Sequence, residues 1–354
     1  MLAEEGHRRE KIEKSMPNEC PTSEAELEDL LSTPSDADRA ALSALKGNLL
    51  MLGAAGKMGP SLARLAKRAA PHLNVIAVAR FSEAHLRPEL ENDGIETHVR
   101  DLLAPGALEA LPEAENVIYL AARKFGTAAD ASPTWATNTV LPGLVAQRYP
   151  KSRIISWSTG NVYPLVPIES GGATEETPLA PVGEYGQSAL GRERIFEYYS
   201  RAQGTPVCML RLNYAVDLRY GVLVDIARQV QAGQTINLEA GHVNVIWQGD
   251  ANSICLRAWD LCASPPSALN VTGSETLTVR EIAEAVGTRL GVTPKFSGTP
   301  AATALLSNSS KCRALYGEPR VTSADLLDWV VQWMTQGGRL LAKPTHFAVR
   351  DGKF

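Results

Sequence analysis

The order of apolar and helical segments from Asn48 onward is the feature that most constrains the fold of this chain. Short apolar runs, each ended by a turn residue or a polar residue, alternate with segments of helical character. The runs read NLLMLG, NVIAVAR, NVIYLAA, RIISWST and VCMLRLNY. Near-continuous apolar strands separated by helices are typical of a parallel sheet with helices on both faces. We therefore expect an α/β fold built on a doubly wound parallel Rossmann sheet.

The segment before this pattern is polar and contains no apolar run. Ser23 followed by Glu26 has the pattern of a capping box, which predicts a short helix from Ser23 to Leu31. A second helix is expected from about Ser35 to Leu45. We therefore expect residues 1–46 to form an N-terminal helical extension that docks on the main domain.

Beyond residue 213 the pattern is less regular, although LTVREIAEAVGTRLG predicts an amphipathic helix. We expect residues 47–213 to form the Rossmann domain, with residues 241–273 returning to it. Residues 214–240 and 274–354 would then form a smaller C-terminal substrate-binding domain and tail. The tail ends in KPTHFAVRDGKF, which either folds over the pocket or a partner subunit, or is a loosely packed end.

Three glycines follow the first predicted strand, at Gly53, Gly56 and Gly59, with Lys57 and Met58 between the last two. Glycines at such a strand–helix turn let the backbone approach a pyrophosphate, and the helix N-terminus offers it free N–H groups. The pattern therefore predicts an NAD-type dinucleotide site. The other interpretation is a glycine-rich turn with no ligand.

The residue after the second strand bears on which dinucleotide is bound. NAD-specific domains usually carry Asp or Glu there, whereas this chain has Arg80. An arginine can pair with the 2′-phosphate of NADP, or it can stack on adenine with either cofactor. We expect NADP or NAD as the cofactor, and Arg80 favours NADP.

Several motifs in order together resemble the extended short-chain dehydrogenase/reductase family, also called the NAD(P)-dependent epimerase/dehydratase family. Beyond the glycines, these are Asp101-Leu102, Leu120-Ala121-Ala122, Asn138, the run from Ser158 to Tyr163, and the run from Tyr185 to Ser188. The resemblance covers about residues 48–335. It implies a homodimer and a set of cofactor contacts at Gly53, Gly56, Lys57, Met58, Gly59, Arg80, Asp101, Leu102, Ala121, Ala122, Arg123, Asn138 and Tyr185.

The resemblance also implies a catalytic pair, with Tyr185 as general acid and base and Thr159 orienting the substrate oxygen. The family's assisting lysine would stand four residues after the tyrosine, where this chain has Ala189. An ordinary tyrosine has a pKa near 10, so only about one molecule in a thousand is phenolate at pH 7. Either another cation helps, or the tyrosine acts as a neutral acid, or the site no longer reacts. The candidate cations are oxidised nicotinamide, Arg123, Lys124 and Arg192.

Relatives that act on nucleotide-sugars usually carry an arginine near the segment Gly241–Val245, and this chain has none there. Arginine is a favoured partner of phosphate, so we expect a free sugar, a sugar acid or a similar polyol rather than a nucleotide diphosphate-sugar. For each candidate pocket residue, a purely structural role is the alternative interpretation. These candidates are Asn161, Tyr163, Asn213, Tyr214, Tyr220 and His242.

The leading function is therefore NAD(P)-dependent oxidoreduction or epimerisation in carbohydrate metabolism. Ala189 keeps open a non-catalytic dinucleotide-binding or sensor protein. A sugar dehydratase is less favoured, because Gly160 and Asn161 follow Thr159 where that chemistry commonly uses an acidic pair.

Charge and composition argue against several other classes. The formal net charge is −4 and no Lys/Arg-rich run occurs, so we expect neither nucleic acid nor an anionic membrane surface as a partner. The five cysteines form no CxxC pair and the six histidines no HxxxH pair, so no metal site is expected. The N-terminus lacks the apolar core of a signal peptide, and we expect a cytoplasmic protein without membrane spans.

Overall fold

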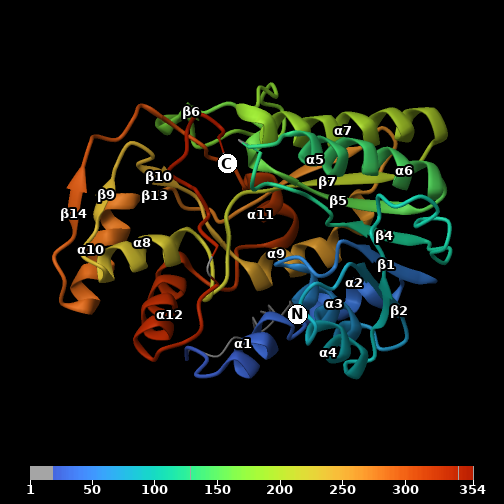
Figure 1. Cartoon of the computed structure of the whole chain (residues 1–354), viewed down its shortest axis with the longest axis horizontal. Helices are drawn as coiled ribbons and strands as arrows, with labels where there is room; N and C mark the ends of the chain where they lie inside the picture. Colours follow the sequence, from blue (N-terminus) through green and yellow to red (C-terminus); the bar gives the residue numbers. More distant parts are fainter. Residues whose placement is uncertain (1–18, 128, 342, 354) are drawn as a thin grey trace, which may run out of the picture.

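A computed structural model describes residues 19–127, 129–341 and 343–353. At its centre lies a seven-stranded sheet in the order β12-β7-β5-β4-β1-β2-β3, and all neighbouring strands are parallel (Figure 1). The strands are β1 (Asn48–Leu52), β2 (Asn74–Ala79), β3 (Glu96–Val99), β4 (Asn116–Tyr119), β5 (Arg153–Thr159), β7 (Val207–Leu212) and β12 (Ser267–Val271). The chain builds β2 and β3 on one side of β1 and then crosses to β4 on the other. This confirms the doubly wound Rossmann sheet and places a crevice at the carboxyl ends of β1 and β4.

The apolar side chains of β1 explain why both faces of the sheet are covered. Successive residues of a strand point to opposite faces. Leu49 and Met51 belong to one core cluster with α3, α4 and α9, whereas Leu50 and Leu52 belong to another with α6 and α7. Figure 1 shows these helix groups on opposite sides of the sheet. The bounds are α3 (Gly59–Ala69), α4 (Leu86–Asn92), α6 (Leu141–Arg148), α7 (Gly183–Gln203) and α9 (Gln248–Arg257).

Two helices precede the sheet, α1 (Glu24–Leu31) and α2 (Asp36–Ser43). The Ser23 side chain accepts from the Glu26 N–H, but the Glu26 carboxylate accepts from the Thr22 N–H at 2.7 Å rather than from Ser23. The reciprocal capping box predicted there therefore lies one residue out of register, whereas α2 has a complete one at Ser35. Residues 1–18 of the predicted extension lie outside the described residues.

The N-terminal helices dock on the rest of the chain, as expected. Leu27, Leu30 and Leu31 of α1 are buried in the core of the C-terminal lobe. Arg64 of α3 donates to Glu28 of α1 at 2.8 Å. The extension therefore bridges the Rossmann sheet and the C-terminal lobe.

The C-terminal lobe packs three helices around its own core and carries two small strand pairs. Its elements are α8 (Val222–Gln231), α10 (Val279–Leu290), α12 (Ser323–Thr335), β9 (Thr235–Asn237) with β14 (Lys295–Ser297), and β10 (His242–Val243) with β13 (Leu277–Thr278). The predicted amphipathic helix is α10. Between these segments the chain returns to the Rossmann sheet as α9 and β12.

Short elements connect the lobe to the sheet. Two further strand pairs are β6 (Val166–Pro167) with β15 (Thr303–Ala304) and β8 (Ala215–Val216) with β11 (Ile246–Trp247). The remaining helices are α5 (Ser132–Trp135), which continues as a π-helical turn into α6, and α11 (Ser310–Tyr316). No helix within the described ranges is both long and apolar enough to cross a membrane.

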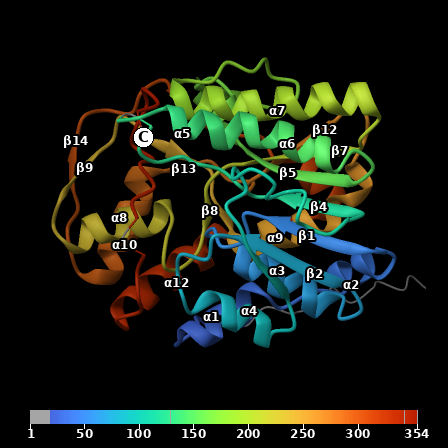
Figure 2. The same cartoon turned by 45° about the vertical axis from the view of Figure 1, so that its right-hand side comes forward.

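The segment after α12 runs back toward the Rossmann domain instead of leaving the molecule. Figures 1 and 2 show it in red, passing between the lobe and the sheet. The Thr345 N–H and hydroxyl both donate to the Asp225 carboxylate of α8, at 2.8 and 2.6 Å. Farther along, Gly352 packs so closely on Gly183 that a Cβ on either would overlap the other's backbone. The C-terminal segment is therefore an ordered part of the wall between the two lobes.

Candidate functional site

A cavity of about 290 Å³ opens at the carboxyl edge of the sheet, where the strand order reverses. Loops after β1, β4, β5 and β7 meet there with α7, α8 and the C-terminal segment. The lining residues are Gly53, Gly56, Lys57, Met58, Gly59, Leu120, Ala122, Lys124, Trp157, Ser158, Thr159, Asn161, Tyr185, Leu212, Asn213, Tyr214, Ala215, Tyr220, Val222 and Thr345. Most of the predicted glycine loop and the predicted catalytic pair therefore lie in one wall.

The glycine loop has the geometry of a close-packed turn with one open position. Gly53 has φ +90°, and a Cβ there would lie 2.6 Å from the Ala121 nitrogen. A Cβ on Gly59, where α3 begins, would lie 2.1 Å from the Ala54 carbonyl oxygen. At Gly56 a Cβ would meet only the Gly53 oxygen, at 3.4 Å. The first and third glycines thus allow packing within the protein, whereas Gly56 faces open space that a pyrophosphate can approach.

Lys57 extends from this loop across the cavity. Its ammonium group donates to the Ala215 carbonyl oxygen at 3.0 Å and lies 3.8 Å from the centre of the Tyr220 ring. Burial of the ammonium lowers the pKa of Lys57 to about 7, and the nearby Asp217 carboxylate opposes that shift. An anion bound in the glycine loop would therefore meet a cation that has little water around it.

The residues predicted to contact adenosine stand at the carboxyl ends of β2 and β3. Arg80 directly follows β2 and is exposed, and Leu102 is buried. The Asp101 carboxylate accepts from the Leu103 N–H at 3.1 Å, which fixes the turn after β3. This edge of the sheet is where a Rossmann domain holds the adenosine, and contacts of these residues with the cofactor stay a prediction.

Thr159 and Tyr185, the predicted catalytic pair, both line the cavity. Thr159 ends β5, and its hydroxyl oxygen accepts from the Asn161 N–H at 3.2 Å and from the Asn161 side-chain amide at 3.0 Å. Those bonds use its lone pairs and leave its O–H to donate. Tyr185 lies in the first turn of α7, and its side chain is largely buried. The predicted catalytic pair therefore lies in one space.

Ala189 lies one helical turn after Tyr185 and is fully buried, in an apolar cluster with Val162, Tyr163 and Leu306. That cluster occupies the space where a lysine side chain would begin. A cation reaches Tyr185 from another element, since the Lys124 ammonium lies 5.7 Å from the centre of the Tyr185 ring. Lys124 also donates to the Thr345 carbonyl oxygen at 3.1 Å.

The surroundings of Lys124 lower its pKa toward neutral pH. Burial lowers the pKa of Lys124 to about 8, against the opposing effect of the Asp225 carboxylate. Of the candidate cations named from the sequence, Lys124 lines the cavity, whereas Arg123 is exposed and Arg192 is buried beneath it.

Asn138 supports the loop that carries Lys124. It is fully buried, accepts from the Arg123 N–H and donates to the Arg123 carbonyl oxygen, both at 3.0 Å, and also donates to Ser188. Arg192 donates to the same Asn138 oxygen at 3.0 Å. Asn138 therefore lies behind the cavity wall, joining the loop to α7, and its predicted contact with the cofactor rests on the motif alone.

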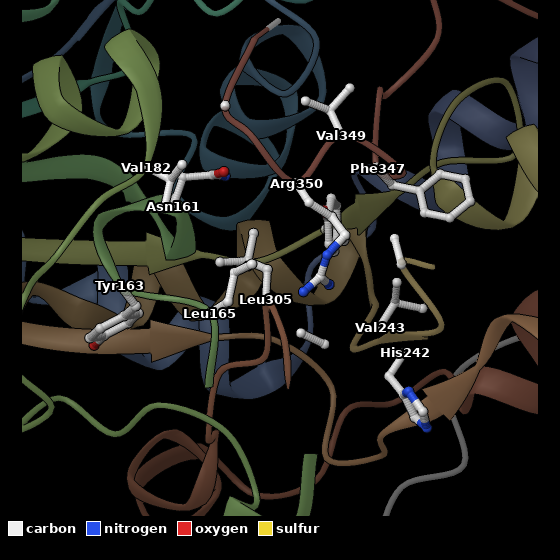
Figure 3. A pocket seen from close by; sticks show the side chains of 14 residues that line it. Asn161, Tyr163, Leu165, Val182, His242, Val243, Leu305, Phe347, Val349 and Arg350 are labelled. Carbon is white, nitrogen blue, oxygen red and sulfur yellow. The ribbon is translucent and has the colours of Figure 1, made fainter. Parts of the chain in front are cut away.

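A second, smaller compartment of about 40 Å³ adjoins the main cavity and shares Asn161 and Tyr214 with it (Figure 3). Its lining is Asn161, Tyr163, Leu165, Val182, Tyr214, Ala240, His242, Val243, Ala304, Leu305, Phe347, Val349, Arg350 and Gly352. Four of the predicted substrate residues thus border this compartment, and Asn213 borders the main cavity. The C-terminal segment contributes part of the lining of this compartment, with Phe347, Val349, Arg350 and Gly352.

Tyr163 has a structural role besides its place in this wall. Its hydroxyl donates to Asn270 and accepts from Arg211, each at 2.8 Å, and Arg211 pairs with the buried Glu193 at 2.8 Å. The pKa of Tyr163 is raised by burial. Arg211 therefore anchors β7 to α7 and does not line the cavity.

Sequence reasoning missed several wall residues, above all Thr345, Phe347, Val349 and Arg350. The aromatic and charged composition of the tail was the available signal, and the described tail residues line both spaces. Ala215 and Val222 gave no comparable signal, because they lie where the regular strand–helix pattern ends. Within the described part of the chain, no group of His, Cys, Asp or Glu side chains is arranged to hold a metal ion.

Comparison with known proteins gives one family match. The model of the "NAD dependent epimerase/dehydratase family" matches residues 49–238, more than half of the chain. No curated protein matches the chain in sequence.

Solved structures with the same fold include three with related descriptions. UDP-glucose 4-epimerase from Thermotoga maritima, solved with UDP-glucose, is 18% identical, with 82% of this chain and 99% of that chain covered and a TM-score of 0.68. A dTDP-glucose 4,6-dehydratase from Bacillus anthracis, solved with NAD, is 19% identical, with coverages of 82% and 97% and a TM-score of 0.69. UDP-glucuronic acid 4-epimerase from Bacillus cereus, solved with NAD, is 19% identical, with coverages of 82% and 99% and a TM-score of 0.68. At these identities the likeness shows a shared fold.

Proposed function

Because the chain belongs to the NAD dependent epimerase/dehydratase family, we propose that it is an enzyme that oxidises or epimerises a small carbohydrate-like alcohol with NAD(P). The family resemblance predicted from the motifs is thereby confirmed. The observation that carries the proposed activity is the meeting of Tyr185, Thr159 and the glycine loop in one cavity.

The cavity suits a dinucleotide. Gly56 leaves its backbone open to the cavity, α3 begins directly behind it, and the Lys57 ammonium stands in the same wall. A helix N-terminus and a buried cation together favour a pyrophosphate. When bound, NAD(P) supplies a nicotinamide carbon that accepts or returns hydride.

The chain's own residues would hold the substrate oxygen and move its proton. Thr159 donates its O–H to the substrate oxygen, while Asn161 keeps the threonine in place. Tyr185 takes the carbinol proton during oxidation and returns it during reduction. The Lys124 cation, near the Tyr185 ring, stabilises the phenolate that forms. Lys124 thus provides from the β4 loop the charge that Ala189 does not.

The choice between NADP and NAD follows from Arg80 in this proposal. No acidic residue stands directly after β2, and the exposed Arg80 side chain at that position would pair with the 2′-phosphate of NADP. The solved structures named above include two with NAD. Dissociation constants for NADP and NAD, measured for the wild type and Arg80→Glu, test the preference: the variant should lose NADP affinity selectively. A wild type that prefers NAD contradicts it.

For the substrate, we propose a free sugar, sugar acid or similar polyol. Three structural neighbours are described with nucleotide-linked sugars. In this chain, however, no arginine lies in Gly241–Val245, and the C-terminal segment narrows the space beyond Asn161 to about 40 Å³. Pockets for drug-sized ligands usually occupy about 300–1,000 Å³. A small substrate is therefore the better fit.

A homodimer is also proposed, through α6 and α7. Leu144 of α6 and Tyr198 of α7 are 39% and 66% exposed, and Val140, at the end of the π-helical turn before α6, is 54% exposed. The two helices lie on the outer side of the sheet in Figure 1. Exposed apolar groups on adjacent helices are typical of an interaction surface. Sedimentation should give a dimer for the wild type and a monomer for Leu144→Glu combined with Tyr198→Glu.

One observation favours a second candidate, a dinucleotide-binding protein without catalysis: the buried Ala189 at the position of the family's lysine. Transfer of deuterium separates the two. The protein is incubated with NAD or NADP and a panel of sugars, sugar acids and polyols labelled with deuterium at the carbinol carbons. Deuterium recovered in the reduced nicotinamide, or an epimer formed from a labelled sugar, supports the enzyme, and tight cofactor binding with neither outcome supports the alternative.

A further inference from the structure

The compartment beyond Asn161 contains one fixed positive charge. Figure 3 shows Arg350 reaching from the C-terminal segment into the middle of the lining residues. Its guanidinium donates to the Thr303 carbonyl oxygen at 2.7 Å and to the Thr303 hydroxyl at 3.0 Å. Two of its five N–H groups are therefore used to fix its orientation, and three remain.

No acidic side chain balances this charge in the compartment. The lining contains no Asp or Glu, and Arg350 forms no ion pair with any other described residue. Most of the wall is apolar, including Leu165, Val243 and Phe347. A charge-assisted hydrogen bond is stronger in such surroundings than in water. A small anionic ligand would supply the negative charge that the lining does not provide for Arg350.

The position of the compartment relates it to the reacting group. Asn161 lines both spaces, and its amide also holds Thr159. A ligand with its carbinol at Thr159 and Tyr185 would extend past Asn161 toward Arg350. The anion would then belong to the same small molecule as the alcohol.

We propose that Arg350 is a specificity-determining residue that binds the carboxylate of the substrate, so that the enzyme prefers sugar acids to neutral sugars. The planar guanidinium matches a carboxylate in a two-point contact. The compartment of about 40 Å³ admits a carboxylate but is far smaller than the pockets that hold nucleotides. This inference rests on the proposed function for the alcohol end of the ligand, and it adds the chemical class of the other end.

Matched pairs of probes test the proposal on the full-length protein saturated with its preferred cofactor. D-Gluconate is compared with D-glucitol and D-glucuronate with D-glucose, since each pair differs in the carboxylate. Calorimetric titration should show that at least one carboxylate binds roughly tenfold or more tightly than its neutral partner. Arg350→Gln should remove about tenfold to hundredfold of that affinity, and Arg350→Lys should retain part of it. Neutral-probe and NAD affinities should not change.

Lys353→Gln is the matched control, because it removes the same charge from the same segment at an exposed position outside the compartment. It should leave the carboxylate preference intact. Equal affinity within both probe pairs, or a preference that survives Arg350→Gln, overturns the proposal. Tighter, Arg350-dependent binding of inorganic phosphate or UDP also overturns it, in favour of a phosphate ligand.

The inference and the proposed function fail in different ways. Carboxylate binding that depends on Arg350, without hydride transfer to any bound acid, supports the anion site and contradicts the enzyme. Tyr185-dependent turnover of neutral polyols supports the enzyme, and the anion site is contradicted if no carboxylate is turned over faster than its neutral partner in the wild type.

Discussion

Cofactor binding should draw a proton from solvent, because Lys57 is largely neutral at pH 8 without an anion beside it. With the pKa of Lys57 lowered to about 7 by burial, only about a tenth of the molecules carry the charge at pH 8, against about nine tenths at pH 6. A pyrophosphate in the glycine loop stabilises the ammonium and raises its pKa. The complex therefore holds more protons than the free protein, and affinity for NAD falls as pH rises through this range.

The size of the effect follows from these fractions. If the pyrophosphate keeps Lys57 fully charged, binding takes up about 0.9 proton at pH 8 and about 0.1 at pH 6, and the dissociation constant rises about tenfold between them. Lys124, with its pKa lowered to about 8, adds at most about 0.5 proton at pH 8 if the anion reaches it.

Calorimetry of NAD binding in two buffers of different ionisation enthalpy measures this uptake directly. Lys57→Met should reduce the uptake at pH 8 to the contribution of Lys124 and flatten the pH dependence of the dissociation constant. Lys311→Met is the control, since Lys311 donates to a backbone oxygen on the exposed surface, away from the cavity. Uptake near zero at pH 8 in the wild type, or unchanged uptake in Lys57→Met, would refute the role of Lys57.

Three further substitutions test the other parts of the site. Gly56→Val places a branched side chain in the open position of the glycine loop, so NAD affinity should fall at least tenfold while the melting temperature stays nearly constant. Unchanged affinity in a calorimetric titration would contradict the assignment of this loop as the pyrophosphate site. Lys124→Gln removes the cation that lies 5.7 Å from the centre of the Tyr185 ring, so the rate of oxidation should fall by roughly tenfold or more; an unchanged rate would contradict the role of Lys124. Ala189→Lys forces a long, charged side chain into a closed apolar cluster, so it should destabilise the fold by about 1–3 kcal/mol or more and lower the activity. Thermal melts and rate measurements test both effects, and a gain in activity would contradict this packing.

The sheet and the glycine loop were predictable from the sequence because both have local signals. Apolar runs of four to seven residues must be buried whatever their neighbours are, and three glycines at fixed spacing encode one turn. The pairing of Thr159 with Tyr185 followed from motifs whose positions in the Rossmann topology bring them to the same edge. These features depend little on how distant segments pack.

The remainder of the site depends on contacts between distant segments. Lys124 follows β4, yet its place beside Tyr185 is set by Asn138 behind its loop and by Thr345 in front. Arg350 becomes a pocket residue because the C-terminal segment is tied to Asp225 and packed on Gly183. No local pattern encodes such contacts. The same limit applies to the capping box expected at Ser23, where Thr22 competes for the Glu26 carboxylate.

The most direct test of the account is the rate of hydride transfer in Tyr185→Phe, measured by the absorbance of the reduced nicotinamide in a single turnover. The wild type, saturated with its preferred cofactor, should oxidise at least one carbinol substrate of the panel. Tyr185→Phe should bind the cofactor with unchanged affinity and react about 10²–10⁴-fold more slowly, because the substituted ring exchanges no proton. Equal rates in the two proteins would contradict the central claim that Tyr185 moves the proton of a carbinol substrate.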